Sequence, residues 1–230
     1  MEAAGIATEQ EPVPIDLGSA SKVEMHNLPV IKAMRQRYPG LKVNRLPNQV
    51  FTLDFERDVV AAEEKLIAEY GFLKEEVSFV MRYNPKFILL QEGSGIKALK
   101  AFLVDQKGFS MEALRTLIVR YPYVLSKTTD DLGTFFETLK SQGLTEEESM
   151  KALLECPKLI SKRDLGKQIK ELQFLFRLYH GINEQELTEV FRSFPYLYLC
   201  DQIKVQKFLG AFRHYKMSKD QILNLVRQYI

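Results

Sequence analysis

The chain has 230 residues, 46% of them apolar, and its 32 basic and 30 acidic side chains leave a net charge of +2. This length and composition allow a sizeable buried core, and no apolar run approaches the ~20 residues that span a membrane. The two cysteines, Cys156 and Cys200, form no C-x-x-C pair, which argues against a zinc site and favours buried thiols in a reducing compartment.

The first 24 residues differ from the rest of the chain. They hold five acidic residues against one lysine, with two prolines and two glycines. This composition predicts an extended, non-helical arm (1–24) that is disordered in isolation. If the arm is ordered in the functional protein, the simplest explanation is that it docks on a partner protein. Transit peptides are rich in arginine and poor in acid, so no targeting peptide is visible. Either a presequence has been removed or is missing, or targeting uses another signal.

A repeated spacing of glycine and proline organises the remainder. A glycine is followed by a proline 14 residues later in four pairs: Gly71 and Pro85, Gly108 and Pro122, Gly143 and Pro157, Gly181 and Pro195. Lys216 occupies the next glycine slot, and counting back from Pro39 places a degenerate first unit at Met25. Such a period indicates one unit stacked on itself. We therefore expect a single repeat domain over 25–230, with units starting near 25, 71, 108, 143, 181 and 216.

Each unit predicts two helices. An apolar residue and then a helix N-cap follow the glycine slot in most copies, at Ser110, Thr145, Asn183, Ser218 and Asn27, with Leu73 as an exception. Capping-box partners stand three residues later at Glu76, Glu148, Glu186 and Gln221. The proline ends this helix. A short apolar turn and a second amphipathic helix follow, at roughly 54–70, 94–107, 130–141, 164–180 and 201–215. No segment alternates like a strand, so the prediction is all-α.

The sequence offers no catalytic constellation. His26, His180 and His214 lack metal-ligand spacing, and Gly93-Ser94-Gly95 lacks the rest of a phosphate loop. We therefore predict that the chain is not an enzyme and holds neither a cofactor nor a metal.

Charge is distributed unevenly along the chain. Residues 25–50 hold five basic residues and no acid, and residues 204–230 hold six basic residues against Asp220. A basic stripe along one face would bind phosphates, whereas the alternative is a solvated mixed-charge surface. The candidate nucleic-acid contacts are Lys32, Arg35, Arg37, Lys42, Arg45, Arg82, Lys86, Arg120, Lys158, Lys162, Arg163, Arg192, Lys204, Lys207, Arg213, Lys216 and Arg227.

The repeat units resemble those of the mitochondrial transcription termination factor (mTERF) family. The resemblance lies in Gly108-Phe-Ser-x-x-x-Leu with Arg120-Tyr-Pro-Tyr-Val-Leu, and in the matching segments 143–160 and 181–197. It covers roughly 25–230. It implies an α-solenoid that forms a curved superhelix, each unit having two antiparallel helices and a short post-proline turn. It also implies non-enzymatic action in mitochondria or chloroplasts, where members bind double-stranded DNA or structured RNA along a positive groove.

Two functions follow from the resemblance and the composition. The leading expectation is a non-catalytic nucleic-acid-binding protein of organellar gene expression, in transcription termination or regulation or in a ribosome-related role, placed in the mitochondrion with the chloroplast as alternative. The rival is a structural or assembly subunit of a large organellar complex such as the mitochondrial ribosome, with the solenoid as a protein-docking scaffold. The near-neutral charge and the acidic arm motivate the rival. Neither function involves a membrane.

Overall fold

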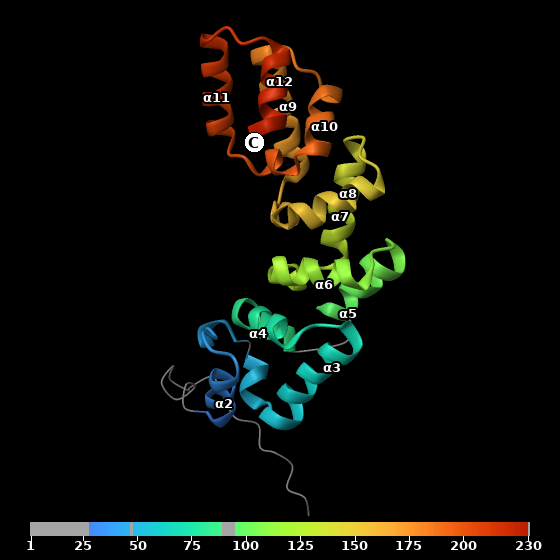
Figure 1. Ribbon diagram of the computed structural model, residues 1–230, viewed down its shortest axis with the longest axis vertical. Helices are drawn as coiled ribbons and strands as arrows, with labels where there is room; N and C mark the ends of the chain where they lie inside the picture. Colours follow the sequence, from blue (N-terminus) through green and yellow to red (C-terminus); the bar gives the residue numbers. More distant parts are fainter. Residues whose placement is uncertain (1–27, 47, 89–94, 230) are drawn as a thin grey trace, which may run out of the picture.

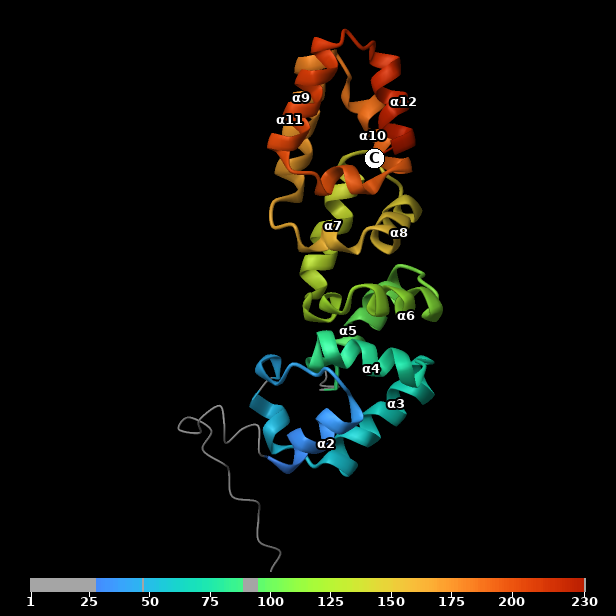
Figure 2. The same ribbon diagram turned by 60° about the vertical axis from the view of Figure 1, so that its left-hand side comes forward.

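The computed structural model describes residues 28–46, 48–88 and 95–229, excluding the side chains of Arg45 and of 226–229. The acidic arm, the start of the first unit at Met25 and its cap Asn27 lie outside these residues. Within them the chain is helical almost throughout and contains no strand, which confirms the all-α prediction. The elements follow one another along the long axis, from α2 at the bottom to α11 and α12 at the top (Figures 1 and 2).

Two series of helices alternate along the chain. The first helix of each unit is α2 (Pro29–Arg37), α4 (Lys74–Tyr83), α6 (Met111–Arg120), α8 (Glu146–Glu155), α10 (Glu184–Ser193) or α12 (Lys219–Tyr229). The second helices are η3 (Phe55–Val60) with α3 (Ala61–Tyr70), α5 (Ile96–Leu99) with η5 (Lys100–Gln106), α7 (Thr129–Ser141), α9 (Leu165–His180) and α11 (Gln202–His214). Short 3₁₀ turns begin at the unit prolines: η4 (Pro85–Ile88), η6 (Pro122–Ser126), η7 (Pro157–Ser161) and η8 (Pro195–Leu199). Two more, η1 (Val43–Arg45) and η2 (Asn48–Thr52), follow α2.

The glycine slot reverses the chain because it takes a left-handed conformation. Gly181 ends α9 with φ +66°, its N–H bonds the Arg177 carbonyl at 2.9 Å, and the Ile182 N–H reaches back to the Phe176 carbonyl at 3.4 Å. This is the Schellman arrangement, in which the apolar residue after the glycine packs inward. Ile182 is accordingly buried. The turn is thus dictated by one residue without a Cβ.

Lys216 adopts this conformation without being glycine. Its φ is +53°, and it has the only positive φ of a non-glycine residue in the described part of the chain. Replacing Lys216 with glycine should raise the free energy of unfolding by about 0.5–1 kcal/mol, because a side chain in the left-handed region costs about 1–2 kcal/mol. Chemical denaturation of Lys216→Gly and Lys216→Ala measures this. An equal gain in Lys216→Ala would show that conformation is not the cause.

The predicted helix caps at Ser110, Thr145, Asn183 and Ser218 are present. The Thr145 hydroxyl accepts the Glu148 N–H at 3.1 Å, and the Glu148 carboxylate accepts the Thr145 N–H at 2.7 Å. Asn183 and Glu186 form the same reciprocal pair at 2.9 Å in both directions. Leu73 supplies no side-chain acceptor, as its type predicts, although Glu76 still accepts its N–H at 2.9 Å. These bonds satisfy the free N–H groups that begin each helix.

The capping carboxylates make stability depend on pH. The Thr145 N–H bond, and then the charge of Arg192, lower the pKa of Glu148 below its ordinary 4.5; bonds from Lys219 and from the Asn183 N–H lower the pKa of Glu186. A carboxyl with a lower pKa when folded stabilises the fold above its unfolded pKa and loses that effect as pH falls through its folded pKa. We therefore expect a constant Tm from neutral pH down to about 5 and a decrease below about 4.5. In thermal melts across this range, Glu148→Gln with Glu186→Gln should show a shallower decrease; an equal decrease would assign it to other groups.

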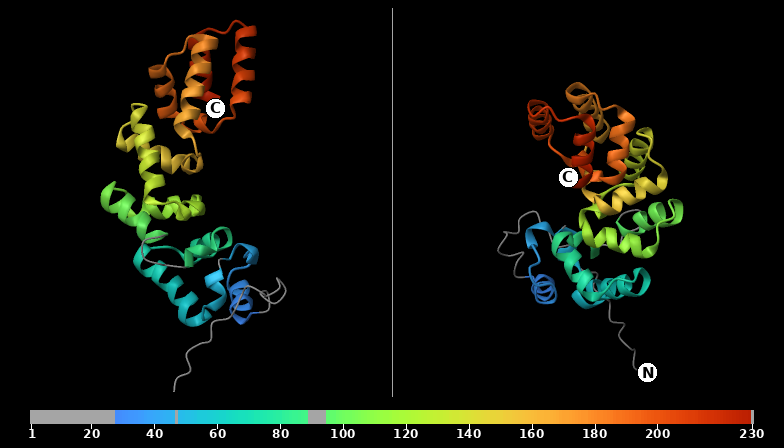
Figure 3. Two further views of the ribbon diagram at one scale, coloured as in Figure 1. Left: turned by 180° about the vertical axis from the view of Figure 1, so that it is seen from behind. Right: turned by 45° about the horizontal axis from the view of Figure 1, so that its top comes forward.

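Successive second helices stack in the C-terminal half. α9 and α11 lie side by side and run in the same direction, because Gln168 Nε2 donates to the Cys200 carbonyl at 3.1 Å and the His180 ring bonds the Leu209 carbonyl at 2.9 Å. The view from behind in Figure 3 shows the same order of units. The core continues from one unit to the next, as a solenoid requires.

Candidate nucleic-acid interface

Two of the arginines placed eleven residues past the glycine slot, Arg82 and Arg192, make contacts within the protein. Arg82 lies 5.7 Å from the centre of the Phe79 ring. Arg192 Nη2 donates to the Gly143 carbonyl at 2.8 Å, and its Nε lies at an ion-pair distance of 3.0 Å from the Glu148 carboxylate. The side chain of Arg227 lies outside the described residues. Arg82 and Arg192 thus support the helices on which they sit and the junction between units.

Two further candidates are also engaged. Arg37 donates from Nε and Nη2 to the Glu63 carboxylate at 3.1 and 3.0 Å. Arg120 Nη1 donates to the Leu154 carbonyl in the next unit at 3.2 Å. The side chain of Arg45 lies outside the described residues. Intramolecular partners therefore hold several of the cations that the sequence suggested for phosphate contacts.

The other candidates are exposed. They are Lys32, Arg35, Lys42, Lys86, Lys158, Lys162, Arg163, Lys204, Lys207, Arg213 and Lys216. Most of them lie at one end of the stack or at the other, as their positions in the chain imply. Lys162 and Arg163, however, line a hollow together, in the loop between η7 and α9.

This hollow, of about 350 Å³, lies between α7, η7 and the beginning of α9. Lys127 and Lys167 line it with Lys162 and Arg163. Lys162, Arg163 and Lys167 also line a second hollow, which borders the start of α11. Four cations from two units thus surround one depression in the surface.

Further hollows continue along α9. Lys170 and Phe174 line one on the side of α11 and another, of about 790 Å³, on the side of α10, where Arg177 also lies. We call these adjoining hollows together the α9 groove. Apart from Arg192, its basic lining is Lys127, Lys162, Arg163, Lys167, Lys170 and Arg177.

The helical period of α9 explains this row. Lys167, Lys170 and Arg177 share an exposed face, whereas Ile169 and Leu172 are fully buried on the opposite one. Sequence reasoning missed Lys127, Lys167, Lys170 and Arg177 because it followed positions fixed by the glycine. Reading the residues opposite the apolar stripe of α9 would have found the three on that helix.

Six carboxylates also line the groove, those of Asp131, Asp164, Glu171, Glu184, Glu189 and Asp201, and some of them are engaged. Asp131 accepts the Thr128 N–H at 3.0 Å, a bond that lowers its pKa and holds its charge at the start of α7. Glu171 lies 3.9 Å from Lys167 and accepts a hydrogen bond from Gln202. Asp164 makes no side-chain bond to the N-terminus of α9.

The start of α9 is electrostatically distinct from that of α8. The first turn of α9 holds no acid, whereas that of α8 holds three. The positive end of the α9 dipole faces the groove beside the N-cap residue Asp164, and it adds to the cations around it. Together with Lys162, Arg163 and Lys167, this helix end favours a phosphate group over a cationic ligand at the start of α9.

The two thiols and His180 are not placed for covalent chemistry. Burial raises the pKa of Cys156 to about 11 and also raises that of Cys200, so both thiols stay protonated at neutral pH. His180 is occupied by the Leu209 carbonyl. Among the residues that the structure describes, no cluster of His, Cys, Asp and Glu could hold a metal ion.

Comparison with known families places this region in context. The sequence model of the mTERF family matches residues 129–230, which span α7 to α12 and contain every basic groove residue except Lys127. No curated protein matches the chain. No helix in the described ranges is long and apolar enough to cross a membrane.

Proposed function

We propose that this chain, whose residues 129–230 match the mTERF family model, is a non-catalytic nucleic-acid-binding protein of organellar gene expression. Members of the family in general bind nucleic acids and act in organelles without catalysis. The α9 groove would contact the phosphates of double-stranded DNA or structured RNA. We place the protein in the mitochondrion, in transcription termination or regulation or in a ribosome-related role.

The grouping of cations along α9 is the observation that carries the proposal. Lys167 and Arg177 are ten residues apart on one helix face, a span of about 15 Å at 1.5 Å per residue. That span matches several steps of one nucleic-acid strand at about 3.4 Å each. Lysines and arginines at such spacing position a phosphate backbone and carry no direct sequence information. The candidate contacts outside the groove stay predictions, and this proposal assigns them a smaller share of the affinity than the groove.

A pair of triple variants tests the site. Lys162→Gln, Arg163→Gln and Lys167→Gln together remove three groove charges, while Lys32→Gln, Arg35→Gln and Lys42→Gln remove three exposed charges from the opposite end of the stack. We expect the groove variant to weaken binding to a labelled DNA duplex or RNA hairpin by on the order of tenfold or more at low salt, because each lost phosphate contact lowers affinity. The matched control should change it little. Equal losses in both variants would contradict the assignment of the groove, and no binding by the wild type would contradict the function.

A further inference from the structure

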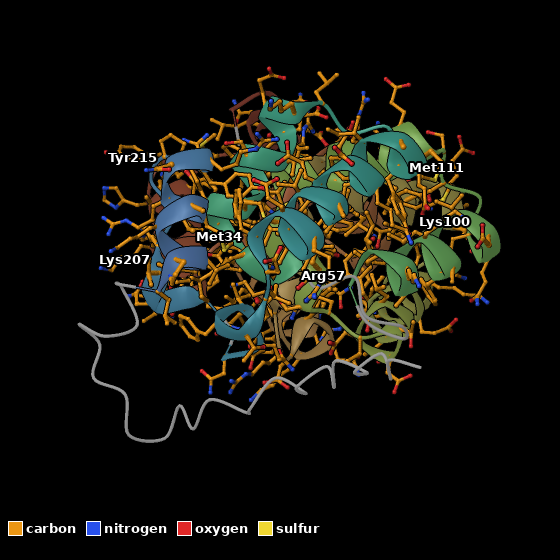
Figure 4. The ribbon with its side chains drawn as sticks, turned by 90° about the horizontal axis from the view of Figure 1, so that it is seen from below. Met34, Arg57, Lys100, Met111, Lys207 and Tyr215 are labelled. Carbon is orange, nitrogen blue, oxygen red and sulfur yellow. The ribbon has the colours of Figure 1, made fainter. Side chains whose placement is uncertain are left out.

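The second helix of the last complete unit carries an apolar stripe that faces solvent. Phe208 on α11 is 61% exposed, and Tyr215, which directly follows the helix, is 74% exposed. Ala211, between them, is exposed too. With Lys204, they recur at the spacing of one helix face. We call these four residues the α11 face. Figure 4 shows Tyr215, and Lys207 beside this stripe, at one edge of the molecule, directed away from its body.

The repeat identifies what such a face contacts elsewhere in the stack. Thirty-six residues earlier, the same stripe on α9 consists of Gln168, Leu172, Leu175 and Tyr179. Leu172 is fully buried, Gln168 donates to the Cys200 carbonyl, and the Tyr179 hydroxyl accepts from Gln206 Nε2 at 3.3 Å. On α9, therefore, this stripe borders and contacts the next second helix, α11. No helix occupies the corresponding place on α11 within the described residues.

The charges around the α11 face indicate what kind of helix could cover it. α11 contains no acidic residue, and the cations Lys204, Lys207 and Lys216 lie on or beside the α11 face. Asp201, at its start, uses its carboxylate to accept the Lys204 N–H at 3.2 Å. A two-fold related second copy would bring these lysines against one another, because a symmetric interface pairs the same patch with itself. Charge complementarity requires a partner with carboxylates instead.

We propose that the α11 face is the docking site of an acidic amphipathic α-helix from another protein, which lies on α11 as α11 lies on α9. Apolar side chains of the partner would cover Phe208, Ala211 and Tyr215, and its carboxylates would meet the lysines beside them. This surface is separate from the α9 groove. The proposal therefore does not rest on nucleic-acid binding.

A synthetic peptide supplies the probe. It contains residues 201–215 of this chain with Lys204, Lys207 and Arg213 replaced by glutamate. The peptide therefore keeps the side of α11 that packs on α9, and it adds an acidic surface. Its control is the unaltered 201–215 peptide, whose lysines would repel those of the face. Fluorescence anisotropy of the labelled peptides against the full chain measures binding. We expect the acidic peptide to bind at least tenfold more tightly than the unaltered one.

Two variants of the full chain locate the binding. Phe208→Glu should weaken binding of the acidic peptide at least tenfold, and Leu178→Glu should leave it unchanged, since Leu178 is equally exposed, at 60%, but lies on α9. Circular dichroism checks that both variants fold. Equal binding of the two peptides, or no effect of Phe208→Glu, would overturn the proposal. So would a dimer of the wild type that Phe208→Glu dissociates, or a loss of duplex or hairpin binding in Phe208→Glu, because each assigns the face to a different occupant.

Discussion

Replacing Glu63 with alanine should lower the free energy of unfolding by about 3 kcal/mol, because it removes the buried carboxylate that accepts from the buried Tyr38 hydroxyl and pairs with the partly exposed Arg37. Glu63 is 2% exposed and joins α3 to α2. Its carboxylate accepts the Tyr38 hydroxyl at 2.8 Å and the two donors of Arg37. Burial and this carboxylate hold the pKa of Tyr38 far above its ordinary value, so the phenol stays a donor. Without Glu63, the buried hydroxyl would have no acceptor.

Urea denaturation followed by circular dichroism measures this effect. Arg57→Ala is a suitable control, since Arg57 forms an ion pair with Asp58 but its side chain is 77% exposed. Exposed pairs contribute about 0–1 kcal/mol, so the control should change stability little. If Glu63→Ala lowers the free energy of unfolding by less than about 1 kcal/mol, these bonds do not contribute substantially to the stability of the N-terminal unit.

Replacing Arg192 with alanine should lower the free energy of unfolding by about 2 kcal/mol, because it removes a charge-assisted hydrogen bond and an ion pair that join two units. Arg192 on α10 donates to the Gly143 carbonyl, at the turn that ends α7, and pairs with Glu148, which caps α8. One side chain thus connects three helices. Its loss would leave the Gly143 carbonyl without this donor and the capping carboxylate without its cation.

Hydrogen exchange distinguishes this role from a general loss of stability. In Arg192→Ala the amides at the start of α8 should exchange faster than those of α4, which is far along the stack. Arg35→Ala removes an exposed arginine from α2 and should alter neither. Uniform acceleration in both helices, or none, would contradict a local role for Arg192.

The sequence predicts the helices of this fold well because their ends depend on local chemistry. The expected second helix at 164–180 is α9 at Leu165–His180, and the one at 201–215 is α11 at Gln202–His214. Gly181 and the residues before Pro195 determine such ends without reference to distant parts of the chain. The spacing also places Lys216 in a glycine slot, and the structure gives it the positive φ that the glycines of this slot adopt.

The site was harder to predict because it depends on neighbours in space. Arg192 looked like a phosphate ligand from its repeat position, but the turn of the preceding unit provides its partners. Arg37 is held by Glu63, 26 residues away. Lys127 and Lys167 line the same hollow although 40 residues separate them in the sequence. They come near each other only because α7 and α9 pack together. Spacing within a unit does not reveal contacts between units.

The salt dependence of binding tests the central claim, that the α9 groove binds a phosphate backbone. If its six cations neutralise phosphates of a DNA duplex, log Kobs against log salt concentration should have a slope of about −5. The triple variant at Lys162, Arg163 and Lys167 should reduce that slope by about 3, one for each charge removed. A slope near zero for the wild type, or the same slope in the triple variant, would contradict the account.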